Sequence, residues 1–503
     1  MRGTTQTSSG QTAEANSETG RRVREALHGI ARSGLIVELH AQLRIAGPLM
    51  LTALVNMGMA ITDVIMMGWI GPLALAAGAV ASDFYSLVFY LCAGVIGAVS
   101  AIVSHARGAR QHRVIRRTIQ QALWAVALLA IPGVLAIWQA PKLLGLIGVQ
   151  HEIIASAGDY ARMMALTLVP MLGVAVWRQL LAAFADTRSI FRITLITLGL
   201  NAAGNYIFMF GKLGLPPLGL AGAGLSSFLC AVFMFAAFSL HVLRNPALSR
   251  YRLLKTQARP DWPRLRELFR VGLPIGVSNL GEVGVYLLST AVIGIFGAEA
   301  LAAHAVALRM AGVLYAFPVG LSQAATVRVG LAAGAGDTAA RSRAARTALG
   351  AAFSAGVLVI IAVAPAREVI AGLFVGDHDD ARRIISYAAL LLLVLAAMQV
   401  FEYVGTVASG VLRGITDTRV PMLISVGSFW GVATVVGIGT GFGFEQQALG
   451  IWIGLGTGAF AFCALMLARL AQQGFHLRPD LVFGRSAPPA VYDGKAWPAV
   501  HER

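Results

Sequence analysis

Long apolar stretches, separated by short polar or glycine- and proline-containing segments, run along most of the chain. A helix needs about 20 predominantly apolar residues to cross the hydrocarbon core of a bilayer, and twelve stretches meet this length. They cover approximately residues 43–68, 74–104, 120–145, 153–182, 188–211, 218–243, 269–296, 300–333, 345–365, 383–412, 419–442 and 447–471. The pattern therefore predicts an all-α polytopic membrane protein with twelve transmembrane helices.

The composition supports the same class. Of the 503 residues, 57% are hydrophobic and 13% are charged, whereas ordinary soluble domains are roughly half apolar and a quarter charged. A soluble enzyme, a secreted disulfide-rich domain and a disordered protein are therefore excluded. The three cysteines, Cys92, Cys230 and Cys463, lie far apart in apolar stretches, so neither a disulfide nor a zinc framework is expected.

Basic residues gather in every second loop. Arg116, Lys255 and Arg341 belong to such clusters, whereas the loops at 69–74 and 295–300 contain no Lys or Arg; the loop after the ninth span, which mixes arginine with aspartate, is the exception. Under the positive-inside rule both termini lie in the cytoplasm. The net charge of +16 is then mostly a topology signal, and no nucleic-acid partner is expected.

Two halves of the chain resemble each other. Residues 66–81 match residues 292–307 at nine of sixteen positions, at an offset of 226, and Asp186–Arg188 matches Asp417–Arg419 at an offset of 231. Six spans separate equivalent positions, so both halves have the same orientation in the membrane. Parallel repeats of this kind place a cavity between two bundles near the bilayer midplane.

The repeat and the polar ends predict five segments. A cytoplasmic tail at 1–40, which lacks the apolar core of a cleavable signal peptide, precedes an N-terminal six-helix lobe at 41–243. A basic cytoplasmic linker at 244–268 leads to a C-terminal six-helix lobe at 269–472, and a second cytoplasmic tail occupies 473–503.

The candidate intramembrane acids are Asp63, Asp83, Glu282 and Glu402, since a charge costs roughly 2.5 to 3.5 kcal/mol at the centre of a membrane-spanning helix and therefore needs a reason. Asp63, Glu282 and Glu402 are the candidates for binding a proton or a cation. We interpret Asp83 as structural, because the repeat places Arg309 at the equivalent position, where it can act as a counter-ion.

Each candidate acid shares a polar stripe with other residues on an apolar helix, and such a stripe faces protein or water rather than lipid. The predicted cavity-lining neighbours are Asn56 beside Asp63, Asn279 and Tyr286 beside Glu282, and Gln399 and Thr406 beside Glu402.

The rise of an α-helix gives the depth of each acid. At about 1.5 Å per residue, Glu282 lies roughly 20 Å and Glu402 roughly 18 Å from the cytoplasmic ends of their spans, so both can meet at one level. Asp63 lies roughly 30 Å from the start of its span, in the outer half. We expect Glu282 and Glu402 to share one proton or sodium ion, and Asp63 to serve a separate site.

Several motifs occur in register from about residue 40 to residue 472: Pro48 with Ile61–Gly68, Asn205–Phe208, Ser322–Gly330, and Gly410–Gly414 followed by Asp417. Together they resemble the multidrug and toxic compound extrusion (MATE) family, on its NorM-like branch. The resemblance implies antiport of organic, commonly cationic, compounds against inward protons or sodium ions, through outward-open and inward-open states.

The resemblance also implies roles for the acids. In that family an acid at the position of Asp63 is associated with proton coupling, and acids at the positions of Glu282 and Glu402 with cation binding. Glu402 stands where Asp is frequent, and Met398 stands where sodium-coupled relatives can carry Tyr. We expect a monomer of the bacterial inner membrane, with organic cations and lipid as partners and no cofactor besides the coupling ion.

Two alternatives have different requirements. A flippase for lipid-linked oligosaccharide, built on a related two-lobed plan, needs arginine or lysine for the pyrophosphate, whereas the charges expected at the midplane are acidic. A membrane-embedded enzyme needs clustered metal ligands or a nucleophile with a base, and no His pair at ligand spacing occurs inside a span. Dye accumulation in cells with and without the protein separates efflux from both.

Overall fold

The computed structural model describes residues 8–146, 150–253, 259–375 and 381–475, and side chains from Gly34 onward. Residues Glu38–Phe475 form one compact unit. Most of the predicted C-terminal tail, part of the predicted linker and the aspartates of the loop after the ninth span lie outside the described residues.

Twelve helices of the described chain are long and apolar enough to cross a membrane, and no strand occurs in this part, so the predicted fold class is confirmed. The first is the segment Gly34–Ile70 of α1 (Ser8–Ile70). The others are α2 (Pro72–Gly108), α3 (His112–Trp138), α5 (His151–Ala183), α6 (Thr187–Phe210), α7 (Gly219–Arg244), α9 (Trp262–Gly294), α10 (Ala298–Gly334), α11 (Thr338–Phe374), α12 (Ala381–Gly414), a composite helix over Arg419–Gly443, and α15 (Gln447–Gln472). Short helices α4 (Ala140–Leu146) and α8 (Pro246–Ser249) lie in connections.

The predicted bounds of the third span, 120–145, are wrong. Helix α3 begins at His112 and ends at Trp138, and the apolar residues Leu143 and Leu144 belong to the separate helix α4. An apolar window marks only the part of a helix that suits hydrocarbon. Arginine is a good helix former, so α3 extends through its basic first turns.

The composite helix departs from α-helical geometry. It consists of α13 (Arg419–Val426), the π-helical segment η1 (Gly427–Ala433), α14 (Thr434–Ile438) and a second π-helical segment η2 (Gly439–Gly443). Segments with π-helical hydrogen bonding are rare and are frequent at functional sites. Periodicity in the sequence gives no sign of this change.

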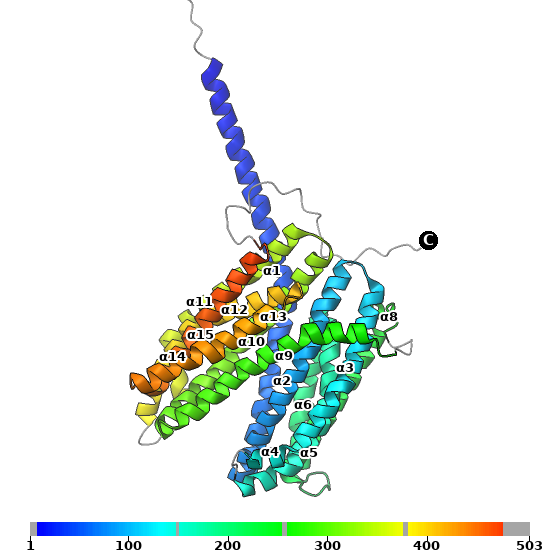
Figure 1. Cartoon of the computed structure of the whole chain (residues 1–503), viewed down its shortest axis with the longest axis vertical. Coiled ribbons are helices and arrows are strands. Elements are labelled where there is room, and N and C mark those ends of the chain that lie inside the picture. The colour runs from blue at the N-terminus through cyan, green and yellow to red at the C-terminus, as the bar shows by residue number, and fades with distance from the viewer. Residues whose placement is uncertain (1–7, 147–149, 254–258, 376–380, 476–503) are drawn as a thin grey trace, which may run out of the picture. The chain divides into compact units, whose positions relative to one another are not determined.

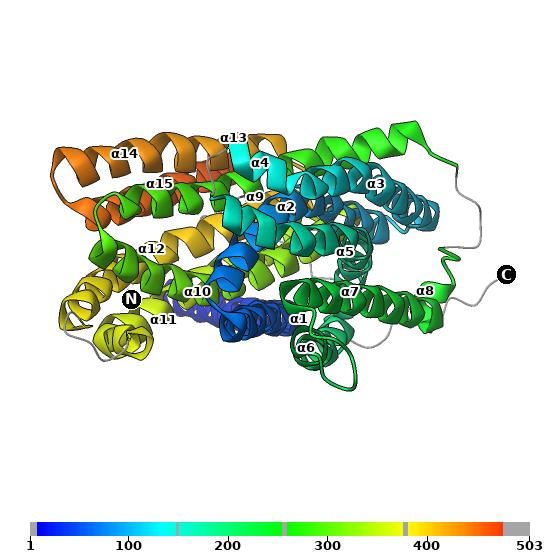
Figure 2. The same ribbon diagram turned by 90° about the horizontal axis from the view of Figure 1, so that it is seen from below.

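The spans form two groups of helices. In the first half α2 packs against α5, which packs against α7, and in the second half α12 packs against α10, α11 and α15. Figure 2 shows the two groups side by side, with α11, α12 and α14 on the left and α3 and α7 on the right.

The two groups are closely packed at one end, which we name the terminal face because residues 38 and 475 lie there. Helix α2 is buried at every residue from Gly94 to Ser104, whereas nearer its start only Tyr85 is buried between Ser82 and Leu91. Figure 1 accordingly shows the groups together at the terminal face and apart at the other end, which we name the opposite face.

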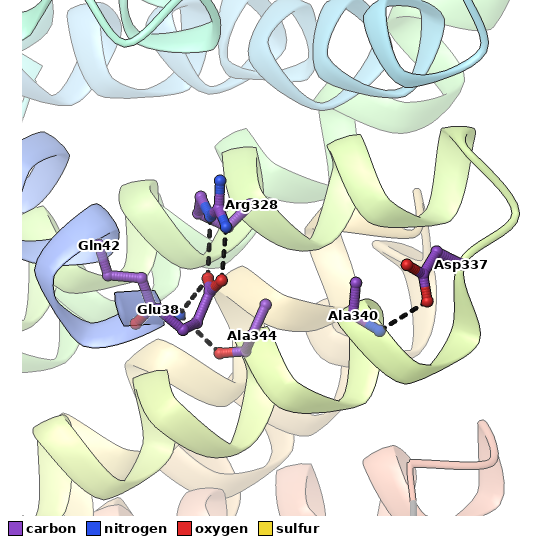
Figure 3. Close-up of polar contacts among 6 residues, drawn as sticks. All are labelled: Glu38, Gln42, Arg328, Asp337, Ala340 and Ala344. Carbon is purple, nitrogen blue, oxygen red and sulfur yellow. Dashed lines mark hydrogen bonds and ion pairs between the residues drawn. The ribbon is translucent and has the colours of Figure 1, made fainter. Parts of the chain in front are cut away.

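Side chains also join the halves at the terminal face. Glu38 of α1 is 7% exposed and pairs with Arg328 of α10, which donates from Nε to Glu38 Oε1 at 2.8 Å and from Nη2 to Oε2. One turn along α1, Gln42 Nε2 donates to the carbonyl oxygen of Ala344 in α11 at 2.7 Å. Figure 3 shows these contacts beside Asp337, which caps α11. This group therefore ties α1 to the second half of the chain.

Candidate functional site

Two predicted acids of the second half lie in one cluster. Glu282 of α9 is close enough to Glu402 of α12 for its charge to act on that carboxyl group. Tyr286, one turn beyond Glu282 on α9, donates from Oη to Glu402 Oε1 at 3.4 Å, and Gln399 is a further hydrogen-bond partner of Glu402. We name Glu282, Tyr286, Gln399 and Glu402 the C-lobe cluster.

Two neighbours of this cluster were not among the predicted site residues. Tyr315 of α10 is a hydrogen-bond partner of Glu282, and Arg413 of α12 acts on Glu282 through its charge. Arg413 belongs to a motif noted in the sequence, whereas Tyr315 carried no signal beyond being a polar residue in an apolar helix. Tyr403 holds α10 in place here, because its hydroxyl donates to the Leu314 carbonyl at 2.7 Å.

The cluster presents oxygens that can accept a proton or a cation. Glu402 is 3% exposed, and its Oε2 and the Oε1 of Gln399 are buried acceptors without a hydrogen-bond donor among the residues that the structure describes. A buried carboxylate is costly unless it is neutralised. The carboxylate, amide and phenol oxygens fit a proton or sodium ion. In the same ranges no three His, Cys, Asp or Glu side chains gather as a metal site.

The first half of the chain carries a second cluster, around Asp63 of α1. Asn205 of α6 donates from Nδ2 to Asp63 Oδ1 at 2.5 Å, and Asn201 is a further hydrogen-bond partner of the same carboxylate. Tyr160 of α5 lies near Asp63, and its hydroxyl forms a hydrogen bond of 3.0 Å with the hydroxyl of Ser82 of α2. We name Asp63, Asn201 and Asn205 the N-lobe cluster.

The asparagines were missed as partners of Asp63, although the sequence carried the signal. Asn201 and Asn205 are one turn apart, so they share one face of α6, and Asn205 opens one of the motifs noted above. Sequence alone cannot tell which helix such a polar face meets. The packing of α1 against α6 supplies that information.

The other predicted lining residues, Asn56, Asn279 and Thr406, belong to neither cluster. Asn56 and Asn279 are half-buried on α1 and α9. Thr406 of α12 is also half-buried, and its carbonyl oxygen accepts from the hydroxyl of Ser322 at 2.8 Å. Their role in lining a cavity stays a prediction. Met398 is buried at 2% exposure.

The composite helix contacts the segment of α9 that carries Glu282. Trp430, in η1, donates from Nε1 to the carbonyl oxygen of Gly281 at 2.8 Å, and its ring lies against Gly284. Glu282 stands between these two glycines on α9. The π-helical segment therefore supports the stretch of α9 that carries the acid.

Asp83 and Arg309 belong to neither cluster. Both are exposed, Asp83 on α2 and Arg309 on α10, and the charge of Arg309 acts on Asp83. The predicted counter-ion is thus near the aspartate, although the two form no ion pair of 4.0 Å or less within the described part of the chain.

Twelve spans in two halves, with an acid in a cluster of polar side chains in each half, define a two-lobed membrane transport protein. The MatE family model matches residues 48–207 and again residues 274–438, so the chain belongs to this family and the resemblance to MATE transporters is confirmed. The starts of the two matches, at 48 and 274, and their ends, at 207 and 438, reproduce the two offsets of the repeat.

Relatives resemble the chain over most of its length. It is 36% identical to a probable multidrug resistance protein NorM of Mesorhizobium japonicum, over 89% of this chain and 96% of that protein. It is 34% identical to the multidrug resistance protein NorM of Burkholderia vietnamiensis, over 78% of this chain and 85% of that protein.

Solved structures share the fold. The eukaryotic MATE transporter AtDTX14 superposes with a TM-score of 0.80 at 22% identity, over 87% of this chain and 96% of that one. An outward-facing multidrug resistance MATE family transporter gives 0.79 at 20% identity, over the same shares.

Proposed function

We propose that the protein is a multidrug efflux antiporter of the bacterial inner membrane. It exports organic, mostly cationic, compounds in exchange for inward protons or sodium ions. The observation that carries this proposal is the C-lobe cluster, in which Glu282 and Glu402 lie together and one buried carboxylate oxygen has no donor among the described residues. The names of the NorM relatives support the substrate class.

The mechanism follows from competition for negative charge. A carboxylate taken out of water needs a proton or a cation to offset the cost of burial. A coupling ion and a cationic substrate that compete for the same carboxylates weaken each other's binding by the same factor, because linkage is reciprocal. Mutual exclusion of this kind makes inward movement of one species drive outward movement of the other.

We infer that Glu282 and Glu402 hold one proton or sodium ion between them. Tyr286 links the two acids, since it lies on the helix of Glu282 and donates to Glu402. The N-lobe cluster draws its partners from α1 and α6 instead, and we assign it a separate proton or cation.

The state described by the structure corresponds to an outward-facing transporter in this proposal. The positive-inside rule puts the terminal face in the cytoplasm, and the halves are closely packed at that face. Alternating access then requires the terminal face to open and the opposite face to close, largely by rocking of one half against the other.

The test is transport by the full chain in proteoliposomes. Export of a fluorescent organic cation such as ethidium is measured with a pH gradient and a sodium gradient imposed separately. Glu282→Gln should abolish export while leaving expression intact, because neutralising an acid in a span does not impair insertion. Glu267→Gln is the matched control, since Glu267 lies on the same helix and forms an exposed ion pair with Arg264. Full export by Glu282→Gln, or no export by the native protein under either gradient, would overturn the proposal.

A further inference from the structure

Helices α2 and α10 are equivalent in the repeat, and they contact each other in a reciprocal way. A side chain on Gly108 would collide with the carbonyl oxygen of Leu331, and one on Gly334 with the carbonyl oxygen of His105. The offset of 226 exchanges Gly108 with Gly334 and His105 with Leu331. The axis that relates the two halves therefore passes between α2 and α10.

Asp83 and Arg309 face this axis from opposite sides. The interval along α2 from Asp83 to Gly108 equals the interval along α10 from Arg309 to Gly334. At about 3.6 residues per turn this interval is close to seven turns, so each charge lies on the face of its helix that carries the contact glycine. Helix α2 starts at Pro72 and α10 at Ala298, which puts both charges roughly 16 Å in from the opposite face.

The surroundings fit two charges that face an open space between the halves. Both side chains are exposed, and charged residues inside spans almost always face protein or a water-filled cavity rather than lipid. Arg309 acts on Asp83 through its charge. The helices that carry the charges are in close contact near the terminal face, at Gly108 and Gly334.

We propose that Asp83 and Arg309 are functional residues of the transport cycle, which close the opposite face by forming an ion pair between the halves when the terminal face opens. The inference rests on the alternating access of the proposed function. Two residues at equal depth on either side of the axis come together when the halves close on it. The Asp83–Arg309 pair is then the counterpart of Glu38 and Arg328, which join the halves in the present state.

A cross-link measures closure without relying on transport. Ala79 and Ala305 are exposed, are equivalent in the repeat, and lie one turn nearer the opposite face than the charged residues. Both are replaced by cysteine in a full chain whose three native cysteines are alanine, and the rate of cross-linking by a short bismaleimide is measured in proteoliposomes.

The single reversals Asp83→Arg and Arg309→Asp place like charges across the axis, and each should slow cross-linking about tenfold. The double variant, with both reversals, should restore the rate to within about threefold of the native rate. Arg309→Lys, which keeps the charge, should remain near native. Glu38→Gln should act in the opposite direction, because it weakens the present state, and should speed cross-linking.

Failure of the double variant to recover, or unchanged cross-linking in both single variants, would overturn the inference. So would a loss of ethidium binding in both Asp83→Arg and the double variant with unchanged cross-linking, because Asp83 would then be a substrate ligand. Should the reversals fail to fold, Asp83→Asn and Arg309→Gln replace them: each should slow cross-linking by a smaller factor, and the double variant should slow it by less than the product of the two factors, whereas effects that multiply would overturn the inference. If the native protein exports ethidium but the double variant does not recover the cross-linking rate, only this inference is refuted. If the double variant recovers the cross-linking rate but the native protein exports nothing, only the proposed function is refuted.

Discussion

Substitution of the two acids in the C-lobe cluster tests whether they hold one ion. Glu402→Gln removes the buried carboxylate that Tyr286 contacts at 3.4 Å and keeps the shape and one oxygen of the side chain. Binding of a cationic substrate to the native protein should weaken as sodium or proton concentration rises. The variant should lose most of that dependence, and adding Glu282→Gln should change it little further.

The expected size follows from the charges. A cation about 4 Å from a carboxylate gains about 4 kcal/mol at an effective dielectric constant of about 20, and about 1.4 kcal/mol corresponds to one decade in affinity. Loss of one carboxylate should therefore weaken ion binding by about one to three decades, with the lower limit set by the oxygen that glutamine retains. For a shared ion, the double variant should add less than about threefold. Independent ions would instead multiply the two effects.

Calorimetric titration of the purified chain with tetraphenylphosphonium, over series of pH and sodium concentration, measures these quantities. Glu267→Gln, an exposed change on the same helix, serves as the control and should leave both series unchanged. The shared-ion reasoning is refuted if Glu402→Gln keeps the native dependence, or if the effects of the two substitutions multiply in the double variant.

Three further predictions concern other parts of the molecule. Asp63→Asn should lower the ratio of ions to drug exchanged in proteoliposomes, whereas Asp83→Asn should slow turnover and leave that ratio near native; equal loss of the ratio in both would show that the wrong acid was chosen in the first half. Trp430→Phe removes the hydrogen bond to the Gly281 carbonyl and should cost about 0.5 to 1.5 kcal/mol of stability, which a thermal shift assay detects; an unchanged melting temperature contradicts the supporting role. Gly334→Val should destabilise the closely packed terminal face by about 1 to 3 kcal/mol and speed the opposite-face cross-link; a slower cross-link would contradict this.

Most of the fold could be predicted from the hydrophobic pattern and the internal repeat of the sequence. Twelve apolar stretches gave the twelve spans, because the bilayer imposes a minimum apolar length that few other structures need. The error at the third span arose where an apolar stretch continued past Trp138 into the separate helix α4. The length of an apolar stretch shows how many residues suit the hydrocarbon core of the bilayer. It does not show where one helix ends and the next begins.

The candidate site, too, could be predicted from the sequence only in part. Glu282, Tyr286, Gln399 and Glu402 could be named from the sequence, since each is a polar residue at helical spacing in an apolar span. Tyr315 could not, because its significance depends on how α10 packs against α9. Contacts between helices distant in sequence leave no periodic signal, so the partners of a buried acid come only from the structure.

The reciprocal contact of Gly108 and Gly334 has the form of an isologous interface, in which the same patch serves on both sides of a two-fold axis. Such interfaces usually join two identical chains, whereas here one chain supplies both copies. Each glycine contacts the backbone of the other half. Neither glycine can therefore be replaced by a larger residue without displacing the helix of the other half. Because one chain supplies both halves, the remaining positions can differ, and Asp83 and Arg309, equivalent yet opposite in charge, are an asymmetry that a homodimer of identical halves could not encode.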